Sequence, residues 1–193
     1  MVLLYSLCAA SILLGIRWMS SPTTAVRGNL LGSAAVLTAV LGVLWAEGLL
    51  LAYDLWIALI LGSSIGLLLG RTVQMMAMPQ FVAILNGLGG AASGVVALVV
   101  LVGPTLTVGL QSYSAALALL IGTLTLSGSI IAAGKLSSKI PGRPLLLPGH
   151  QGWTIFLGLA GFLLFVWAGS TGLGWVVALL LLIDLAFGVV FTV

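Results

Sequence analysis

Residues 79–102 read PQFVAILNGLGGAASGVVALVVLV, and this stretch decides the fold. It contains no charged side chain and is almost entirely apolar. A membrane-spanning helix needs about 20 mostly apolar residues to cross roughly 30 Å of hydrocarbon. The stretch therefore predicts a transmembrane helix, and its proline at the first turn and the Gly103 and Pro104 that follow it mark the two ends.

Asn86 is the polar exception within this stretch, roughly 10 Å along the axis from the predicted cytoplasmic start. An amide in lipid needs a partner, and the small residues after it let a helix or a ligand come close. Those small residues include Gly87, Gly89, Gly90, Ser93 and Gly94. Two interpretations stay open: an interhelical hydrogen bond, worth about 0.6 kcal/mol on average in membranes, or a link in a hydrated polar path.

The composition of the whole chain indicates that the other segments also lie in a membrane. Hydrophobic residues make up 62% of the chain and charged residues 5%, against about 45–50% and about 25% in ordinary globular proteins. We predict an all-α integral membrane protein, a polytopic bundle of about seven transmembrane helices forming a single domain over residues 1–193. The predicted spans are 2–18, 29–46, 52–70, 79–102, 112–134, 152–168 and 173–193. A β-barrel is rejected, because runs such as Leu179 to Ile183 are apolar without alternation.

The basic residues predict the orientation. None precedes the first span, whereas Arg17 and Arg27 follow it, which argues against a signal peptide and puts the N-terminus outside. All six Lys and Arg fall at odd-numbered loops, the others being Arg71, Lys135, Lys139 and Arg143. The C-terminus is then cytoplasmic, and the net charge of +3 is a topology signal that gives no support to nucleic-acid binding.

Five polar residues inside the spans are candidates for a hydrated polar path or a functional site: Asn86, Thr125, Ser127, Ser129 and Asp184. The hydroxyls of the fifth span form two pairs four residues apart, Thr123 with Ser127 and Thr125 with Ser129, so each pair stacks on one face. Such hydroxyls either bond back to their own helix or line a polar surface. Asp184 is costly in lipid unless paired or protonated, which makes it a functional candidate, the alternative being helix packing with the acid kept neutral.

Other residues predict packing and docking. The third span carries a stripe of glycines at four-residue spacing, and the fourth span has its own set, both suited to close helix contact. These packing glycines are Gly62, Gly66, Gly70, Gly87, Gly89, Gly90 and Gly94. The fifth loop, Lys135 to Gln151, contains Pro141, Pro144 and Pro148 and is expected to be stiff and extended. It is either a docking surface for another domain or a tether at the headgroups, with Lys135, Lys139, Arg143 and His150 as its polar residues.

Chemistry within the chain is not expected. One His, one Cys and three acids form no catalytic set and no metal-ligand spacing, and Cys8 has no partner for a disulfide. Gly87, Gly89 and Ala92 match the loose G-x-G-x-x-A fingerprint of dinucleotide sites. That match is rejected, because the fingerprint requires a preceding strand and here lies inside a predicted span.

Three blocks of sequence carry a resemblance to a known family. They are SPTTAVRGN at 21–29, MPQFVAILNGLGG at 78–90, and TLSGSIIAAGKL at 125–136 with Lys139 and RPLLLPG at 143–149. In order and spacing they resemble the membrane part of the proton-translocating NAD(P) transhydrogenase β subunit. The resemblance implies a multi-pass protein of the inner (plasma) membrane that couples proton movement to hydride transfer between NADH and NADP⁺.

The same resemblance implies the partners. NAD(H) and NADP(H) would bind soluble partner domains on the cytoplasmic side and not this chain, and the whole complex would be a dimer. Many relatives carry histidine where this sequence has Asn86, and asparagine cannot take up a proton. We expect a membrane subunit of the α type to supply a relay histidine instead. The resemblance also implies a membrane domain of nine helices. Because seven spans are predicted here, we expect two further helices to be absent.

Two other functions stay open at this stage. The chain could be a passive scaffold whose polar groups only hold helices together, with conduction in partner chains. It could also be an unrelated small-solute carrier, although no inverted repeat is evident between its halves.

Overall fold

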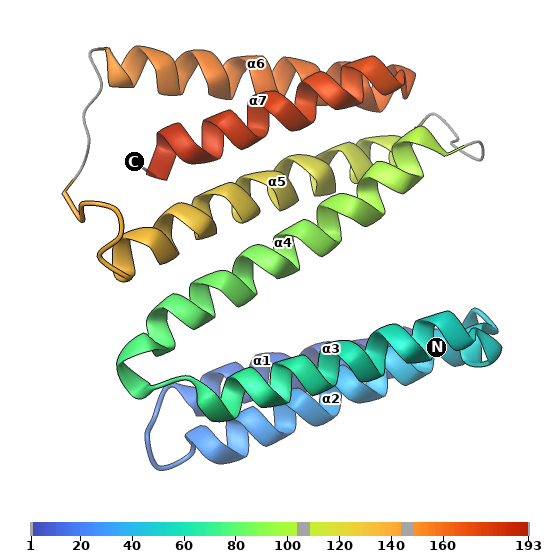
Figure 1. The fold of residues 1–193 in the computed structure, drawn as a ribbon. Coiled ribbons are helices and arrows are strands. Elements are labelled where there is room, and N and C mark those ends of the chain that lie inside the picture. Colours follow the sequence, from blue (N-terminus) through green and yellow to red (C-terminus); the bar gives the residue numbers. More distant parts are fainter. Residues whose placement is uncertain (1, 104–108, 144–148, 193) are drawn as a thin grey trace. The chain divides into compact units, whose positions relative to one another are not determined.

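The computed structural model describes residues 2–103, 109–143 and 149–192, and within these ranges the chain is helical with no strand (Figure 1). The long helices are α1 (Val2–Met19), α2 (Ala25–Ala46), α3 (Tyr53–Thr72), α4 (Met78–Val102), α5 (Leu110–Leu136), α6 (His150–Thr171) and α7 (Gly174–Thr192). Two short 3₁₀ turns, η1 (Leu49–Leu51) and η2 (Met75–Ala77), precede α3 and α4. The predicted all-α class is confirmed.

Each predicted span falls on one of these helices. Six helices in the described part of the chain are long and apolar enough to cross a membrane, namely α2 to α7, with α4 counted together with η2. The stretch Leu3–Met19 of α1 is also apolar but shorter. The prediction of a polytopic helical membrane bundle is thus confirmed, while the side on which each terminus lies stays a prediction.

The chain divides into two compact units, Met1–Arg71 and Thr72–Val193. In the first unit, α1 and α2 pack through glycines, because a Cβ built at Gly15 would lie 2.9 Å from the carbonyl oxygen of Gly28. Helix α3 has no buried residue. That the whole of 1–193 is a single transmembrane domain stays a prediction.

In the second unit, α5 packs against α4, α6 and α7, and α6 packs against α7 (Figure 1). The core where α4, α5 and α7 meet is built from fully buried aliphatic side chains, among them Leu101, Leu119, Val176, Val177 and Leu180. The turn from α6 to α7 is tight because Gly172 takes a left-handed conformation with φ of 61°. Trp167 and Trp175 stack edge to face across this turn, 4.9 Å between ring centroids. Helix α5 is therefore the central element of the unit.

Candidate functional site

Asn86 and Ser129 form a hydrogen bond that joins two helices. The Asn86 Nδ2 on α4 donates to the Ser129 Oγ on α5 at 3.0 Å, across 43 residues of sequence. Ser129 is 8% exposed, so its side of the bond lies inside the helix pair. The polar residue that the sequence singled out thus finds a polar partner on the hydroxylated helix.

Glycines on α4 allow this close approach. A Cβ built at Gly90 would lie 2.7 Å from the Gly122 carbonyl oxygen, and one at Gly87 would lie 3.0 Å from the Ser129 Cβ. Gly94 is also buried, whereas a Cβ at Gly89 would meet nothing within 4 Å. Three of the four candidate packing glycines of α4 therefore face α5, and Gly89 lines the outer side.

The other candidate hydroxyls of α5 donate to carbonyl groups of their own helix. Thr123 donates to the Leu119 carbonyl at 2.8 Å, Thr125 to Ile121 at 2.7 Å, and Ser127 to Thr123 at 3.0 Å. These side chains lie against different neighbouring helices. The Thr125 side chain lies against Gly90 of α4, while Ser127 lies against Gly188 of α7. Helix α5 therefore presents hydroxyls toward both of these neighbours.

A groove runs along α4 and α5 beside the hydrogen bond. One hollow of about 460 Å³ is lined by Asn86, Gly89, Ser93 and Thr125, among others. A second hollow of about 590 Å³ shares Ser93 with the first and continues to Gln111. The shared lining makes one groove with polar groups spaced along it, open on the side away from the helix contact.

Asp184 lies elsewhere in the unit, in the core between α5, α6 and α7. Its side chain is 1% exposed, and neither carboxyl oxygen has a hydrogen-bond partner among the described residues. On the α6 side it meets Gly161, where a Cβ would lie 2.6 Å from the Asp184 Oδ1. The carboxyl group is therefore tightly packed and has no hydrogen-bond partner among the described residues.

The residues of the predicted docking loop take different positions. Lys135 lies in the last turn of α5, half-buried, and its Nζ donates to the Thr192 carbonyl at the end of α7 at 2.6 Å. Lys139 and Arg143 are exposed, and His150 is the first residue of α6. Residues 144–148, with Pro144 and Pro148, lie outside the described residues, so the docking role stays a prediction.

Two polar contacts were not anticipated from the sequence. Gln80 Nε2 of α4 donates to the Leu136 carbonyl at the end of α5 at 3.0 Å. Ser112, fully buried near the start of α5, donates to the Gly169 carbonyl of α6 at 2.6 Å. The only signal available was position, since both residues stand within the first turn of a predicted span, where polar side chains commonly complete the backbone bonds of helix ends.

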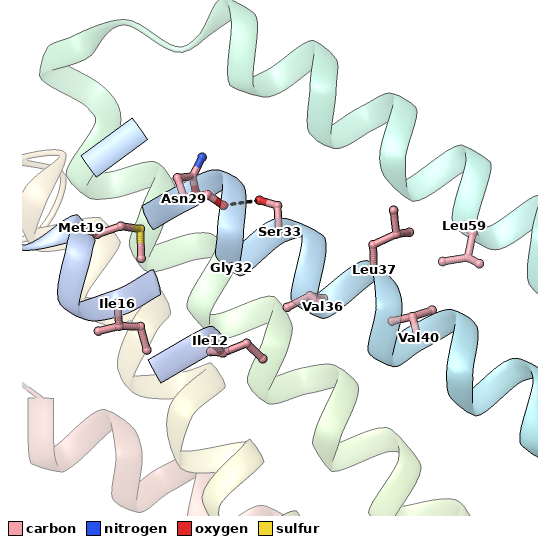
Figure 2. Close-up of a pocket in the computed structure, with 10 residues that line it drawn as sticks. All are labelled: Ile12, Ile16, Met19, Asn29, Gly32, Ser33, Val36, Leu37, Val40 and Leu59. Carbon is pink, nitrogen blue, oxygen red and sulfur yellow. Dashed lines mark hydrogen bonds between the residues drawn. The ribbon is translucent and has the colours of Figure 1, made fainter. Parts of the chain in front are cut away.

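The first unit contains an apolar hollow of its own, of about 500 Å³, between α1, α2 and one residue of α3 (Figure 2). Asn29 and Ser33 are its polar residues, and the Ser33 hydroxyl donates to the Asn29 backbone carbonyl at 2.8 Å. The remaining lining is aliphatic side chains, Met19 and Gly32. With so few polar groups, this hollow suits a lipid chain or a neighbouring helix more than a polar ligand.

The described residues contain no group of three or more His, Cys, Asp or Glu side chains that could hold a metal ion. Gly87, Gly89 and Ala92 lie inside α4 with no strand before them, so they do not fit a nucleotide either. What remains is a helical membrane protein of several spans with a hydrogen-bonded pair between two helices, a groove with a few polar side chains beside it, and a buried carboxyl group. These features define the class of polytopic α-helical membrane proteins with polar groups inside the bundle.

Comparison with known proteins identifies the family. The chain matches the family described as NAD(P) transhydrogenase beta subunit over residues 1–193. Two sequences named NAD(P) transhydrogenase subunit beta, both from Rhodospirillum rubrum and one from a particular strain, are each 32% identical over 153 residues. The match covers 75% of this chain and 33% of the relative, so it spans about a third of these proteins. The chain belongs to the NAD(P) transhydrogenase beta subunit family.

Proposed function

We propose that this chain is the proton-translocating membrane part of an NAD(P) transhydrogenase. Hydride transfer between NADH and NADP⁺ takes place in soluble domains outside these helices, and the helices couple that reaction to proton movement across the inner membrane. Membership of the beta subunit family and the six helices suited to spanning support this function.

The hydrogen bond between Asn86 and Ser129 is the observation that carries the proposal. It joins the exposed amide of Asn86 to the buried hydroxyl of Ser129, at the edge of an open groove that carries a few polar side chains. An asparagine amide donates and accepts hydrogen bonds but cannot exchange a proton at physiological pH. Asn86 therefore orients water or a titratable side chain in the groove, and Ser129 holds the amide in place.

The titratable side chain in this groove comes from a partner. In the described part of α4, no residue titrates, and α5 contributes only Tyr113 and Lys135 near its two ends. A histidine on a helix of an α-type membrane subunit, seated in the groove of about 460 Å³, would complete the relay. Gating then needs two conformations whose populations shift by a few kcal/mol with the nucleotide state of the docked domains.

The scaffold alternative is favoured by the same bond, since an interhelical hydrogen bond can serve packing alone. Asn86→Leu in the complete complex, reconstituted in vesicles, separates the two functions. A relay role predicts that proton pumping per assembled complex falls at least tenfold. A scaffold role predicts less assembled complex, with unchanged protons moved per hydride transferred in what survives.

Two further variants sharpen this experiment. Ser129→Ala removes the partner of Asn86, and if the two side chains act as a unit the double variant is no worse than either single one. Thr38→Val is the matched control, because its exposed hydroxyl on α2 bonds only to the Ala34 carbonyl of its own helix, at 2.8 Å. Wild-type pumping by Asn86→Leu would overturn the proposal.

A further inference from the structure

We propose that Asp184 is a proton-carrying group of this chain, a carboxyl that is protonated in the structure described here and releases its proton during transport. This inference rests on the proposed function and adds to it the titratable group that Asn86 cannot be. It is carried by the geometry of the core between α5, α6 and α7.

The first step is that the described helices of the second unit place no countercharge near Asp184. The other titratable or charged side chains in the described parts of α4 to α7 are Tyr113, Lys135 and His150. Tyr113 packs against Gly169 and Phe165, and Lys135 donates to the carbonyl of Thr192, about 12 Å along α7 from Asp184.

His150 is equally remote, because it starts α6 about 16 Å along the axis from Gly161, the residue that meets the carboxyl group. An ionised carboxylate that is 1% exposed and has no cation or donor beside it would be very costly. The neutral acid is therefore the form that this core accommodates.

The second step is the close packing around the carboxyl group. Gly161 leaves just enough room for the carboxyl group, since a Cβ there would lie 2.6 Å from the Asp184 Oδ1. The described residues offer no second ligand beside the carboxyl group, whereas metal ions such as Mg²⁺ or Ca²⁺ take about six or more oxygen ligands, so the proton is the cation that suits this site. Release breaks the O–H bond, leaves the electron pair on the carboxylate and passes the proton to a water molecule, and uptake reverses the step.

The third step connects Asp184 with the Asn86 groove. One turn after Asp184, Gly188 of α7 lies against the Ser127 side chain of α5. Two residues further along α5, Ser129 accepts the hydrogen bond from Asn86. Helix α5 thus contacts both elements, with Ser129 bonded to Asn86 of α4 and Ser127 beside Gly188 of α7, one turn from Asp184.

Infrared spectra of the complete reconstituted complex test the protonation state. The wild type should show the carbonyl band of a protonated carboxylic acid that is missing from Asp184→Asn, a variant of equal size. Pumping per hydride should fall at least tenfold in this variant. Identical spectra in that region, or wild-type pumping, would overturn the inference.

Variants of α6 test the packing around the Asp184 carboxyl group. Gly161→Ala should displace the carboxyl group, shift its band and lower pumping, while Gly158→Ala on the same helix should change neither, because its Cβ would sit 3.5 Å from the Phe187 ring. Adding Asp184→Ala to Gly161→Ala relieves the clash, so assembly should recover while pumping does not. Recovery of both would show that Asp184 serves packing alone.

The outcomes also separate this inference from the proposed function. If the wild-type complex pumps and Asp184→Asn pumps equally well, only the role of Asp184 fails. If the wild-type complex moves no protons at all, the proposed function fails first, and the transport role of Asp184 falls with it.

Discussion

Ser112 links the start of α5 to the end of α6 by a hydrogen bond, so replacing it should lower the free energy of unfolding. Its hydroxyl accepts from the Gly109 amide at 3.0 Å and lies 2.6 Å from the Gly169 carbonyl, fully buried. Ser112→Ala leaves both backbone groups without this partner, which should cost about 1–3 kcal/mol. Denaturant unfolding of the purified chain in detergent measures this loss.

Ser114→Ala is the matched control for that experiment. Ser114 stands two residues later on α5, and it is exposed where Ser112 is buried. Its replacement should change the unfolding free energy by less than about 0.5 kcal/mol. Equal losses for the two variants would show that the contact with Gly169 contributes nothing.

Single residues also show where sequence reasoning stops. Asn86 stands out in the sequence because a strongly polar amide is rare in an apolar span. Its partner is not readable in the same way, because the bond to Ser129 spans 43 residues and depends on how α5 is rotated about its axis. The spacing of Thr125 and Ser129 fixes that they share a face, but only tertiary packing decides that this face meets α4.

The contact between α4 and α5 depends on glycine at particular positions. Gly90→Ala would drive a Cβ to 2.7 Å from the Gly122 carbonyl oxygen and 2.8 Å from the Thr125 Cβ. Such overpacking typically costs about 1–3 kcal/mol, and here it should also lengthen the Asn86 to Ser129 bond. Gly89→Ala, the adjacent position with open space, should leave the stability of the chain unchanged. A Gly90→Ala chain as stable as the Gly89→Ala chain would contradict the close approach.

Helix boundaries were predictable for a physical reason. Pro79 and Gly103 bracket α4, so the predicted span 79–102 differs from Met78–Val102 by one residue at its start. The prediction for α2 began at residue 29, whereas the helix begins at Ala25, because the turn that contains Arg27 extends it beyond the apolar run. Apolar length marks what lipid can cover, and helices continue past it where polar side chains reach water.

The sequence shows where a stripe of glycines lies on a helix but not whether another helix packs against it. The stripe Gly62, Gly66 and Gly70 on α3 has no atom within 4 Å of any added Cβ, unlike Gly90 on α4. Four-residue spacing creates a smooth face in both helices but does not say which neighbour uses it. For α3 the packing role therefore stays a prediction.

The distribution of charge over the whole chain predicts its orientation in the membrane, and labelling can test this. Arg17 and Arg27 flank the turn from α1 to α2, and Lys139 and Arg143 follow α5. Basic residues near short loops are retained on the cytoplasmic side. Each of these loops is therefore expected inside, and the turns after α2 and α6 outside.

Cysteine labelling with a membrane-impermeant maleimide distinguishes the two sides in sealed vesicles. In a Cys8→Ser background, Ser20→Cys should react only from the cytoplasmic side, whereas Glu47→Cys and Thr171→Cys should react only from the outside. All three positions are exposed, so reactivity reports the side of the membrane and not burial. Because α1 is the shortest of the apolar stretches, its neighbour Ser20 is the decisive position. If Ser20→Cys and Glu47→Cys react from the same side, α2 does not cross the membrane, and the charge-based orientation is wrong.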